Sequence, residues 1–278
     1  MKLYSVALDL PLDDLLTYTG NGDLKEGMLV LVPLRNRIEK GIIVEVKDSF
    51  LIPDMELKEI VEVVYPEPLL NKEQILLGLW MSSMYISSPG EALFKMFPAP
   101  LKKIPPPLQK KKLIKRPDHF LNEEQDNAFL SIKEDMLRRQ NGIHILFGVT
   151  GSGKTEVYIH LIEQAIAGGG SAMLLVPEIT LTVQTIKRLD NVFGDELALL
   201  HSGLSGKKRF YDYIAVLRGE KKIVVGTRSA VFAPLQNPAI FIADEDHDPS
   251  YKEHSTPRYD ARDVMRKRAR DASSPVVF

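Results

Sequence analysis

The feature that most constrains this chain is a glycine-rich turn, GVTGSGKT at 148–155, between two segments of different character. The preceding segment, IHILF, is apolar enough for a buried strand, and the following TEVYIHLIEQAI has helical spacing. The turn matches the pattern G-x-x-x-x-G-K-[ST], and it lies between a strand and a helix, as that pattern requires. In this motif, backbone N–H groups and a helix N-terminus bind phosphate. The sequence therefore predicts a nucleotide site.

The rest of the chain from residue 119 onward supports an α/β fold. Apolar segments alternate with helical ones; they are SAMLLVP, LALLHS, KIVVGT, AIFIADE and PVVF. Strands that are apolar throughout are typical of a parallel sheet covered by helices on both faces. The chain stops on the last of these segments, without a polar tail, and from this we expect a truncated protein.

The N-terminal part has a different pattern. Residues 1–65 contain short β-branched runs separated by turns, which predicts a small sheet or barrel. Residues 71–97 show helical spacing interrupted at Pro89, with Asn71 as the expected N-cap and Gln74 three residues later. The proline- and lysine-rich stretch 98–118 is typical of a semi-rigid linker. We predict three parts: a β-rich domain with C-terminal helices at 1–97, a linker at 98–118 and an ATPase lobe at 119–278.

Composition limits the remaining possibilities. The chain has no cysteine, which excludes disulfides, cysteine–zinc sites and a thiol nucleophile within it. Without a signal peptide or a long apolar run, we expect a cytoplasmic protein with no membrane partner. Residues 1–101 carry 9 basic and 15 acidic side chains, whereas 102–278 carry 27 and 22. Basic clusters at 102–116 and 262–270 are either solvated faces or sites for nucleic acid.

The phosphate loop and a later acidic sequence together predict ATP and Mg²⁺ chemistry. Lys154 can reach the β- and γ-phosphates, and the Thr155 hydroxyl can coordinate Mg²⁺. Asp244 follows an apolar strand, where a parallel-sheet NTPase holds its metal, and Glu245 can polarise water as a general base. The predicted nucleotide-binding residues are Gln125, Gly148, Thr150, Gly151, Ser152, Gly153, Lys154 and Thr155.

Other polar residues are expected at the same edge of the sheet, because they also follow strands. Small polar groups there suit contacts with a phosphate backbone. The segment 248–262 mixes aromatic and basic residues, which suits stacking on unpaired bases or, alternatively, a solvated loop with packed tyrosines. The predicted DNA-binding residues of this region are Pro177, Thr182, Gln184, Gly226, Thr227, Arg228, Ser229, Tyr251, Lys252, Arg258, Tyr259 and Arg262.

At this point a family resemblance is evident. GVTGSGKTEVY, LVPEITLTVQ, HSGLS, VGTRSAVF, ADEDHDPSYK and PRYDARDV occur in the order and spacing of the primosomal protein N′ family, which are bacterial replication-restart DNA helicases of superfamily 2. The resemblance implies a RecA-like P-loop NTPase lobe preceded by a small β-rich 3′-DNA-binding domain. It implies coupling roles for Asp246 and His247 beside the catalytic Lys154, Asp244 and Glu245. It also implies DNA contacts for Tyr18 and Lys58, with Arg35 near the same pocket.

The resemblance also implies an activity and partners. Members of this family are ATP-dependent 3′–5′ DNA helicases that act in primosome assembly at stalled forks. The expected cofactors are ATP and Mg²⁺, with zinc only in a C-terminal part that this chain lacks. The expected partners are forked and single-stranded DNA, single-strand-binding protein and other primosome proteins, in a bacterial, nucleoid-associated setting. The family's winged-helix domain does not fit into 98–118.

Two alternatives stay open on the sequence. Another superfamily 2 DNA translocase would share the phosphate loop and the DExH sequence but would not explain the N-terminal match. A non-catalytic DNA-binding module with a purely structural ATPase lobe would share both the phosphate-loop region and the N-terminal region. We expect the isolated chain to be nearly inactive, because the second lobe and its arginine are absent.

Overall fold

The computed structural model describes residues 2–48, 57–101, 104–109, 120–149 and 151–278. The chain divides into two compact units. The first contains the residues up to Ile104 together with His254–Tyr259, and the second contains Pro105–Glu253 and Asp260–Phe278. The division near residue 104 falls within the predicted linker, of which 110–118 lies outside the described residues. The predicted domain boundaries at 97 and 118 stay predictions.

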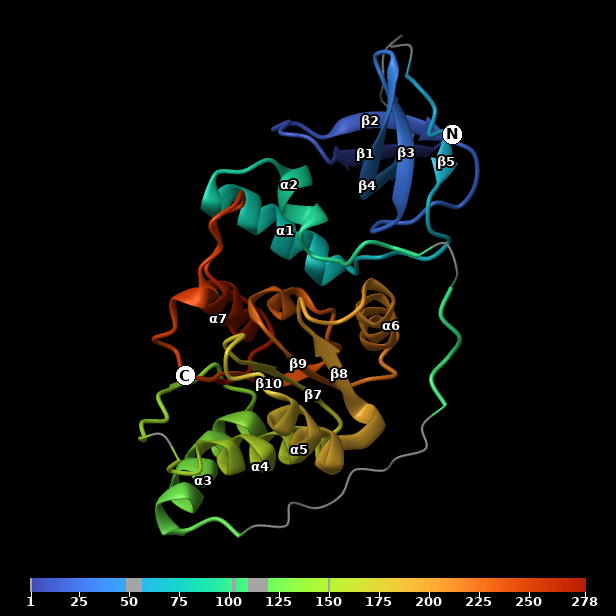
Figure 1. Ribbon diagram of the computed structural model, residues 1–278. Coiled ribbons are helices and arrows are strands. Elements are labelled where there is room, and N and C mark those ends of the chain that lie inside the picture. Colours follow the sequence, from blue (N-terminus) through green and yellow to red (C-terminus); the bar gives the residue numbers. More distant parts are fainter. Residues whose placement is uncertain (1, 49–56, 102–103, 110–119, 150) are drawn as a thin grey trace. The chain divides into compact units, whose positions relative to one another are not determined.

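The first unit is built on an antiparallel sheet, as its β-branched runs predicted (Figure 1). Its strand order is β2-β1-β4-β3-β5, and Tyr4, Val6 and Ile43 contribute to the buried core beneath it. The strands are β1 (Lys2–Leu8), β2 (Leu16–Gly20), β3 (Leu29–Leu34), β4 (Arg37–Asp48) and β5 (Glu62–Val63).

Two capped helices follow this sheet, α1 (Lys72–Tyr85) and α2 (Pro89–Phe94). Asn71 caps α1 and forms the predicted capping box with Gln74. Pro89, predicted as a break, is the residue at which α2 begins, because proline needs no hydrogen bond at the first helical position.

The second unit contains the predicted parallel sheet, with six strands in the order β6-β11-β10-β7-β9-β8. The strands are β6 (Ile143–His144), β7 (Ser171–Leu175), β8 (Leu197–Leu200), β9 (Ile223–Gly226), β10 (Pro238–Ala243) and β11 (Val276–Val277). The predicted strand 143–148 is shorter than expected, although Leu146 still donates a backbone hydrogen bond to Phe278. All strands run in one direction, so the loops that follow them lie at one edge.

Helices cover both faces of this sheet, as expected for buried parallel strands (Figure 1). On one face lie α3 (Glu123–Arg138), α4 (Lys154–Ala167) and α5 (Val183–Phe193); on the other lie α6 (Gly206–Leu217) and α7 (Ala261–Asp271). Short 3₁₀ helices occur at η1 (Gly194–Glu196), η2 (Arg228–Phe232) and η3 (Pro249–Tyr251). Within the described ranges, every helix is too short or too polar to cross a membrane.

Candidate nucleotide- and DNA-binding site

The phosphate loop depends on two glycines with positive φ. Gly151 has φ of 83° and Gly153 has φ of 85°, a region that side chains with a Cβ rarely adopt. Gly153 is the N-cap of α4, which begins at Lys154. A Cβ on Gly153 would lie 2.4 Å from Gln125 Nε2, so a side chain there would displace the Gln125 amide as well as strain the backbone. The predicted Thr150 lies outside the described residues.

Gln125 lies against the phosphate loop, and its role in binding nucleotide stays a prediction. Its Oε1 accepts a hydrogen bond from the Asn122 backbone at 3.0 Å, which completes the capping box of α3. Its Nε2 donates to the Ser152 carbonyl at 2.9 Å. One amide side chain therefore connects the start of α3 to the loop that precedes α4.

Lys154 and Glu245 face one another across the site. Lys154 Nζ donates to the Gly148 carbonyl at 2.7 Å and lies 3.7 Å from Glu245 Oε1. The lysine side chain is only 18% exposed. The cation of the phosphate loop and the acidic residue expected to act as a base thus share one site, as the sequence predicted.

Asp244 and its neighbours follow β10 in a tight turn. Glu245 has φ of 48°, the left-handed region, and its carbonyl accepts the Asp248 N–H at 2.9 Å. Non-glycine residues in this region are uncommon and cluster at functional sites. Burial raises the pKa of Asp244, and the charge of Glu245 adds to this, whereas the Tyr158 hydrogen bond and Lys154 oppose it. His247 is exposed, with Nδ1 3.6 Å from Glu245 Oε2.

The donor groups fit a magnesium ion bound together with a nucleotide. Mg²⁺ is usually held by one or two carboxylates and substrate phosphates rather than by an all-protein cage. Asp244 offers a carboxylate and Thr155 a hydroxyl, while within the described part of the chain no group of three metal-binding side chains could form a cage.

The segments after β7, β8, β9 and β10, together with α6, line a small cavity of about 190 Å³ at the same edge of the sheet. The lining includes three predicted DNA-binding residues, Thr227, Arg228 and Ser229. Thr182 and Gln184, which follow β7 in the chain, are exposed. Thr182 caps α5. Pro177 and Gly226 are buried and shape the strand ends without offering a free side chain.

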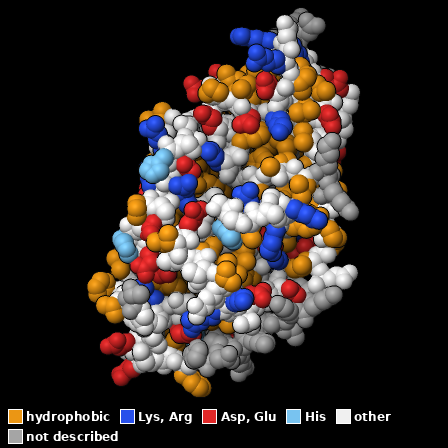
Figure 2. All heavy atoms as spheres, in the orientation of Figure 1, with side chains coloured by type: hydrophobic (Ala, Val, Ile, Leu, Met, Phe, Trp, Pro, Cys, Tyr) orange, Lys and Arg blue, Asp and Glu red, His pale blue; other side chains and the backbone are white. Residues whose placement is uncertain are grey.

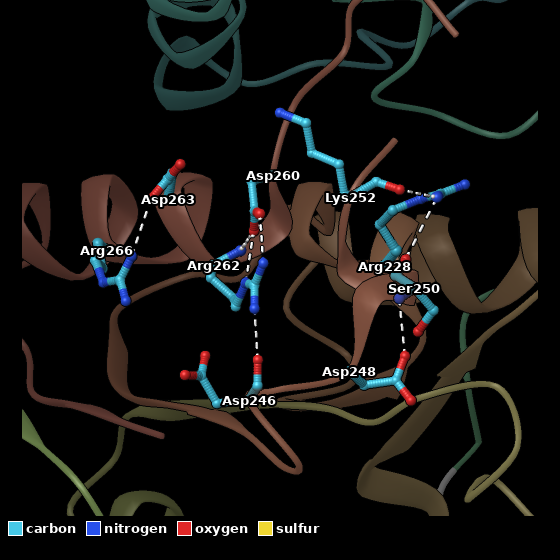
Figure 3. A network of polar contacts seen from close by, with 9 residues as sticks. All are labelled: Arg228, Asp246, Asp248, Ser250, Lys252, Asp260, Arg262, Asp263 and Arg266. Atoms are coloured by element: carbon cyan, nitrogen blue, oxygen red, sulfur yellow. Dashed lines mark hydrogen bonds and ion pairs between the residues drawn. The ribbon is translucent and has the colours of Figure 1, made fainter. Parts of the chain in front are cut away.

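The predicted Arg228 is used within the protein. Its guanidinium donates to the carbonyls of Lys252 at 2.6 Å and Ser250 at 3.3 Å (Figure 3). It also pairs with Glu253 at 2.9 Å. The loop after β10 is therefore attached to the end of β9 by one arginine.

A second arginine fixes the other end of the same loop. Arg262 pairs with Asp260 at 2.7 Å and donates to the Asp246 carbonyl at 2.5 Å (Figure 3). Burial raises the pKa of Asp260, but the hydrogen bonds and charge of Arg262 lower it by more, so this pKa is lowered overall. Further along α7, Arg266 pairs with Asp263 at 2.9 Å. Arg262 and Arg266 of the predicted basic cluster at 262–270 are thus paired with acids. Figure 2 shows basic and acidic side chains interspersed over the described part of one face.

Three tyrosines predicted at DNA surfaces are buried instead. Tyr251 is 0% exposed and Tyr259 2%, and stacking on bases requires an accessible ring, so the stacking prediction is wrong for both. The Tyr251 hydroxyl lies 2.6 Å from the Asp244 carbonyl oxygen. Tyr18 is 3% exposed and donates to the Pro33 carbonyl at 3.3 Å, so its ring belongs to the core of the first unit. Apolar ring area and a satisfied hydroxyl together favour burial.

Two other predicted residues remain accessible. Lys58 is exposed, and its ammonium donates to the Arg35 carbonyl at 3.4 Å. Arg258 is exposed, whereas Lys252 is half-buried and bridges to Asp260 through the backbone.

Sequence reasoning missed Tyr158 and Arg209. Tyr158 donates to Asp244 Oδ1 at 3.1 Å, and its spacing of three residues from Thr155 on a predicted helix was the available signal. Arg209 lines the small cavity beside Arg228, and nothing local in the sequence marked it.

Comparisons with known proteins agree with this geometry. Residues 122–270 match the family model for the DEAD/DEAH box helicase, and residues 5–98 match that for the PriA 3′DNA-binding domain (3′BD). Replication restart protein PriA of Treponema pallidum is 34% identical over 98% of this chain and 43% of its own length. The Helicobacter pylori (strain 26695) protein is 37% identical over 90% and 38%, and the Bacillus subtilis protein 44% over 62% and 21%. The chain thus spans less than half of these relatives.

Proposed function

The chain belongs to the DEAD/DEAH box helicase family, and on this premise we propose that it is the ATP- and DNA-binding portion of a replication restart helicase. In the longer protein, ATP hydrolysis would drive 3′–5′ movement along single-stranded DNA and unwinding at forks. The observation that carries the proposal is the convergence of Lys154, Asp244 and Glu245 at one edge of the parallel sheet. The match of residues 5–98 to a 3′-DNA-binding domain supports the substrate.

Each residue of the nucleotide site has a proposed role. Lys154 neutralises the β- and γ-phosphates, and the N–H groups of 151–155 surround them. Thr155 and Asp244 would hold Mg²⁺, and the bound ion would polarise the transferring phosphate. Glu245 accepts a proton from the attacking water, and its turn conformation keeps it facing Lys154. Asp246 and His247 transmit the state of this site to the loop that Arg262 anchors.

The DNA path is proposed along the exposed residues at the strand ends. Thr182, Gln184 and Ser229, all in the second unit, offer polar groups to phosphates. Arg258 belongs to the first unit and offers a positive charge there. In the first unit, Lys58 is the proposed contact for a 3′ end. Arg228 and Arg262 support this surface from inside, since their guanidinium groups are engaged by the protein.

The finer partners are also proposals. Single-strand-binding protein and primosome proteins would bind a restart helicase, and zinc would be held outside this cysteine-free chain. The kinship with PriA proteins of bacteria supports a cytoplasmic, nucleoid-associated setting.

Two substitutions test the nucleotide site. Lys154→Ala should weaken binding of a fluorescent ATP analogue at least tenfold, because the cation of the loop is lost; Lys207→Ala, an exposed lysine on α6, is the matched control. Glu245→Gln should leave this affinity within about twofold, because the amide preserves shape, and should abolish hydrolysis in the longer protein. Equal binding by Lys154→Ala and wild type would overturn the assignment.

A further inference from the structure

A buried tyrosine holds the carboxylate expected to bind magnesium. Tyr158 is 2% exposed, and its hydroxyl donates to Asp244 Oδ1 at 3.1 Å. A buried hydroxyl is costly unless it is paired, and a carboxylate is a strong acceptor. The contact therefore fixes both groups.

The origin of the two residues gives the contact its significance. Tyr158 lies on α4, the helix that begins with Lys154, and it follows Thr155 by three residues. Residues three apart lie on the same side of a helix, so Thr155 and Tyr158 both face the strand end that carries Asp244. One helix thus supplies the phosphate-binding lysine, the metal-binding hydroxyl and the hydrogen bond to the metal-binding carboxylate.

The main chain of Asp244 is held separately. Its N–H donates to the Leu175 carbonyl at 2.9 Å, and its own carbonyl oxygen lies 2.6 Å from the Tyr251 hydroxyl. These contacts fix the main chain of Asp244, but they leave rotation about its side-chain bonds unrestrained. The carboxylate itself accepts hydrogen bonds from the backbone of Glu245, its neighbour in the same turn, and from the Tyr158 hydroxyl. The Tyr158 hydroxyl is the restraint that comes from another element of the fold.

We propose that Tyr158 is a positioning residue that orients the Asp244 carboxylate for the Mg²⁺–nucleotide complex. This inference rests on the proposed function of the site. Mg²⁺ demands near-octahedral geometry, so a carboxylate that is free to rotate binds it less well. Removing a hydrogen-bond partner of a metal ligand typically costs 10–100-fold in metal affinity.

The test is Tyr158→Phe, which removes only the hydroxyl. Binding of a fluorescent, non-hydrolysable ATP analogue is titrated with Mg²⁺, and a parallel series is measured in EDTA. We expect the Mg²⁺ concentration for half-maximal binding to rise about tenfold, with the affinity in EDTA unchanged. Tyr4→Phe is the matched control, because Tyr4 is fully buried in the first unit and donates to the Gly22 carbonyl at 3.2 Å.

A double-mutant cycle separates orientation from general packing. In an Asp244→Ala background, Tyr158→Phe should cause no further change in the Mg²⁺ requirement, because no side-chain oxygen is left for the Tyr158 hydroxyl to orient. An additional tenfold loss in that background would overturn the proposal. An equal loss of affinity in EDTA would also overturn it, since the hydroxyl would then support the phosphate loop rather than the carboxylate.

The failure of this inference is distinguishable from failure of the proposed function. If the wild-type chain binds the analogue with a Mg²⁺ dependence that Tyr158→Phe leaves unchanged, the positioning role alone is overturned. If the wild-type chain binds no nucleotide with or without Mg²⁺, the proposed function falls and this inference falls with it. Circular dichroism melting of the variant shows that the altered requirement belongs to a folded protein.

Discussion

At the scale of single residues, the side chains that hold the site together also stabilise the elements around it. Gln125 caps α3 with its carbonyl oxygen and holds the phosphate loop with its amide nitrogen. Arg228, predicted to contact DNA, pairs with Glu253 and holds the loop after β10. A residue whose polar atoms are already hydrogen-bonded within the protein contributes to ligand binding by positioning its neighbours.

His201 gives a pH prediction at this scale. Burial lowers the pKa of this imidazole, Arg209 lowers it further, and the charge of Glu178 only partly opposes them. The unfolded chain therefore binds the proton more readily than the folded one. The stability associated with neutral His201 is fully present above the ordinary pKa of about 6.5 and is lost as the pH falls below that value.

The measurement is urea unfolding of wild type and His201→Gln at pH 8 and pH 5.5. Wild type should lose more free energy of unfolding between these pH values than the variant, because glutamine does not titrate. Identical losses in the two proteins would show that His201 does not contribute to the pH dependence.

At the scale of elements, α1 and α3 begin with the same device in different surroundings. Asn71 with Gln74 and Asn122 with Gln125 both form complete capping boxes. Only the second glutamine also reaches the phosphate loop, through the 2.9 Å bond to Ser152. The two caps therefore form a matched pair for experiment.

We predict that Asn71→Ala and Asn122→Ala each destabilise their unit by about 1 kcal/mol, the usual cost of an N-cap. Only Asn122→Ala should also weaken nucleotide binding, by a few-fold, because loss of the side-chain cap loosens the first turn of α3, from which Gln125 reaches Ser152. Denaturant unfolding and binding of the fluorescent ATP analogue measure the two effects. Equal nucleotide affinities in both variants would contradict a link between the cap and the loop.

Another element, the segment 104–109, belongs to the second unit over most of its length. Arg218 Nη1 donates to the Pro105 carbonyl at 2.9 Å, and the Leu108 N–H donates to Glu220 Oε2 at 3.1 Å. Part of the predicted linker is therefore attached to the end of α6.

At the scale of the whole molecule, two compact units predict two unfolding events. A ligand that binds only the folded form stabilises by RT ln(1 + [L]/Kd), about 2.7 kcal/mol at a hundredfold excess over Kd. Mg²⁺ with a non-hydrolysable ATP analogue should therefore raise the transition of the second unit and leave that of the first unchanged. Differential scanning calorimetry measures both, and Lys154→Ala, which should remove the shift, is the control.

DNA provides the complementary measurement. A duplex with a recessed 3′ end should raise the transition of the first unit if the proposed end-binding role of that unit is correct. Its effect should weaken with salt, because phosphate contacts release counterions. A shift confined to the second unit would instead place DNA binding at the strand ends of the parallel sheet.

Features that depend on local physics could be predicted from the order of residues alone. The glycines of the phosphate loop, the capping boxes and the alternation of apolar strands with helices follow from backbone conformation and side-chain periodicity over a few residues. These features predicted the parallel sheet and the position of Lys154 and Asp244 at its edge.

Which side chains are accessible, and which contact one another, became evident from the packed fold. Tyr251 and Tyr259 lie in a polar loop whose composition suited DNA, yet their rings are buried because packing decides exposure. Tyr158 and Asp244 are 86 residues apart in the chain, and Arg228 and Lys252 are 24 apart. Such contacts depend on how the helices and strands pack, a relation that no local window of sequence contains.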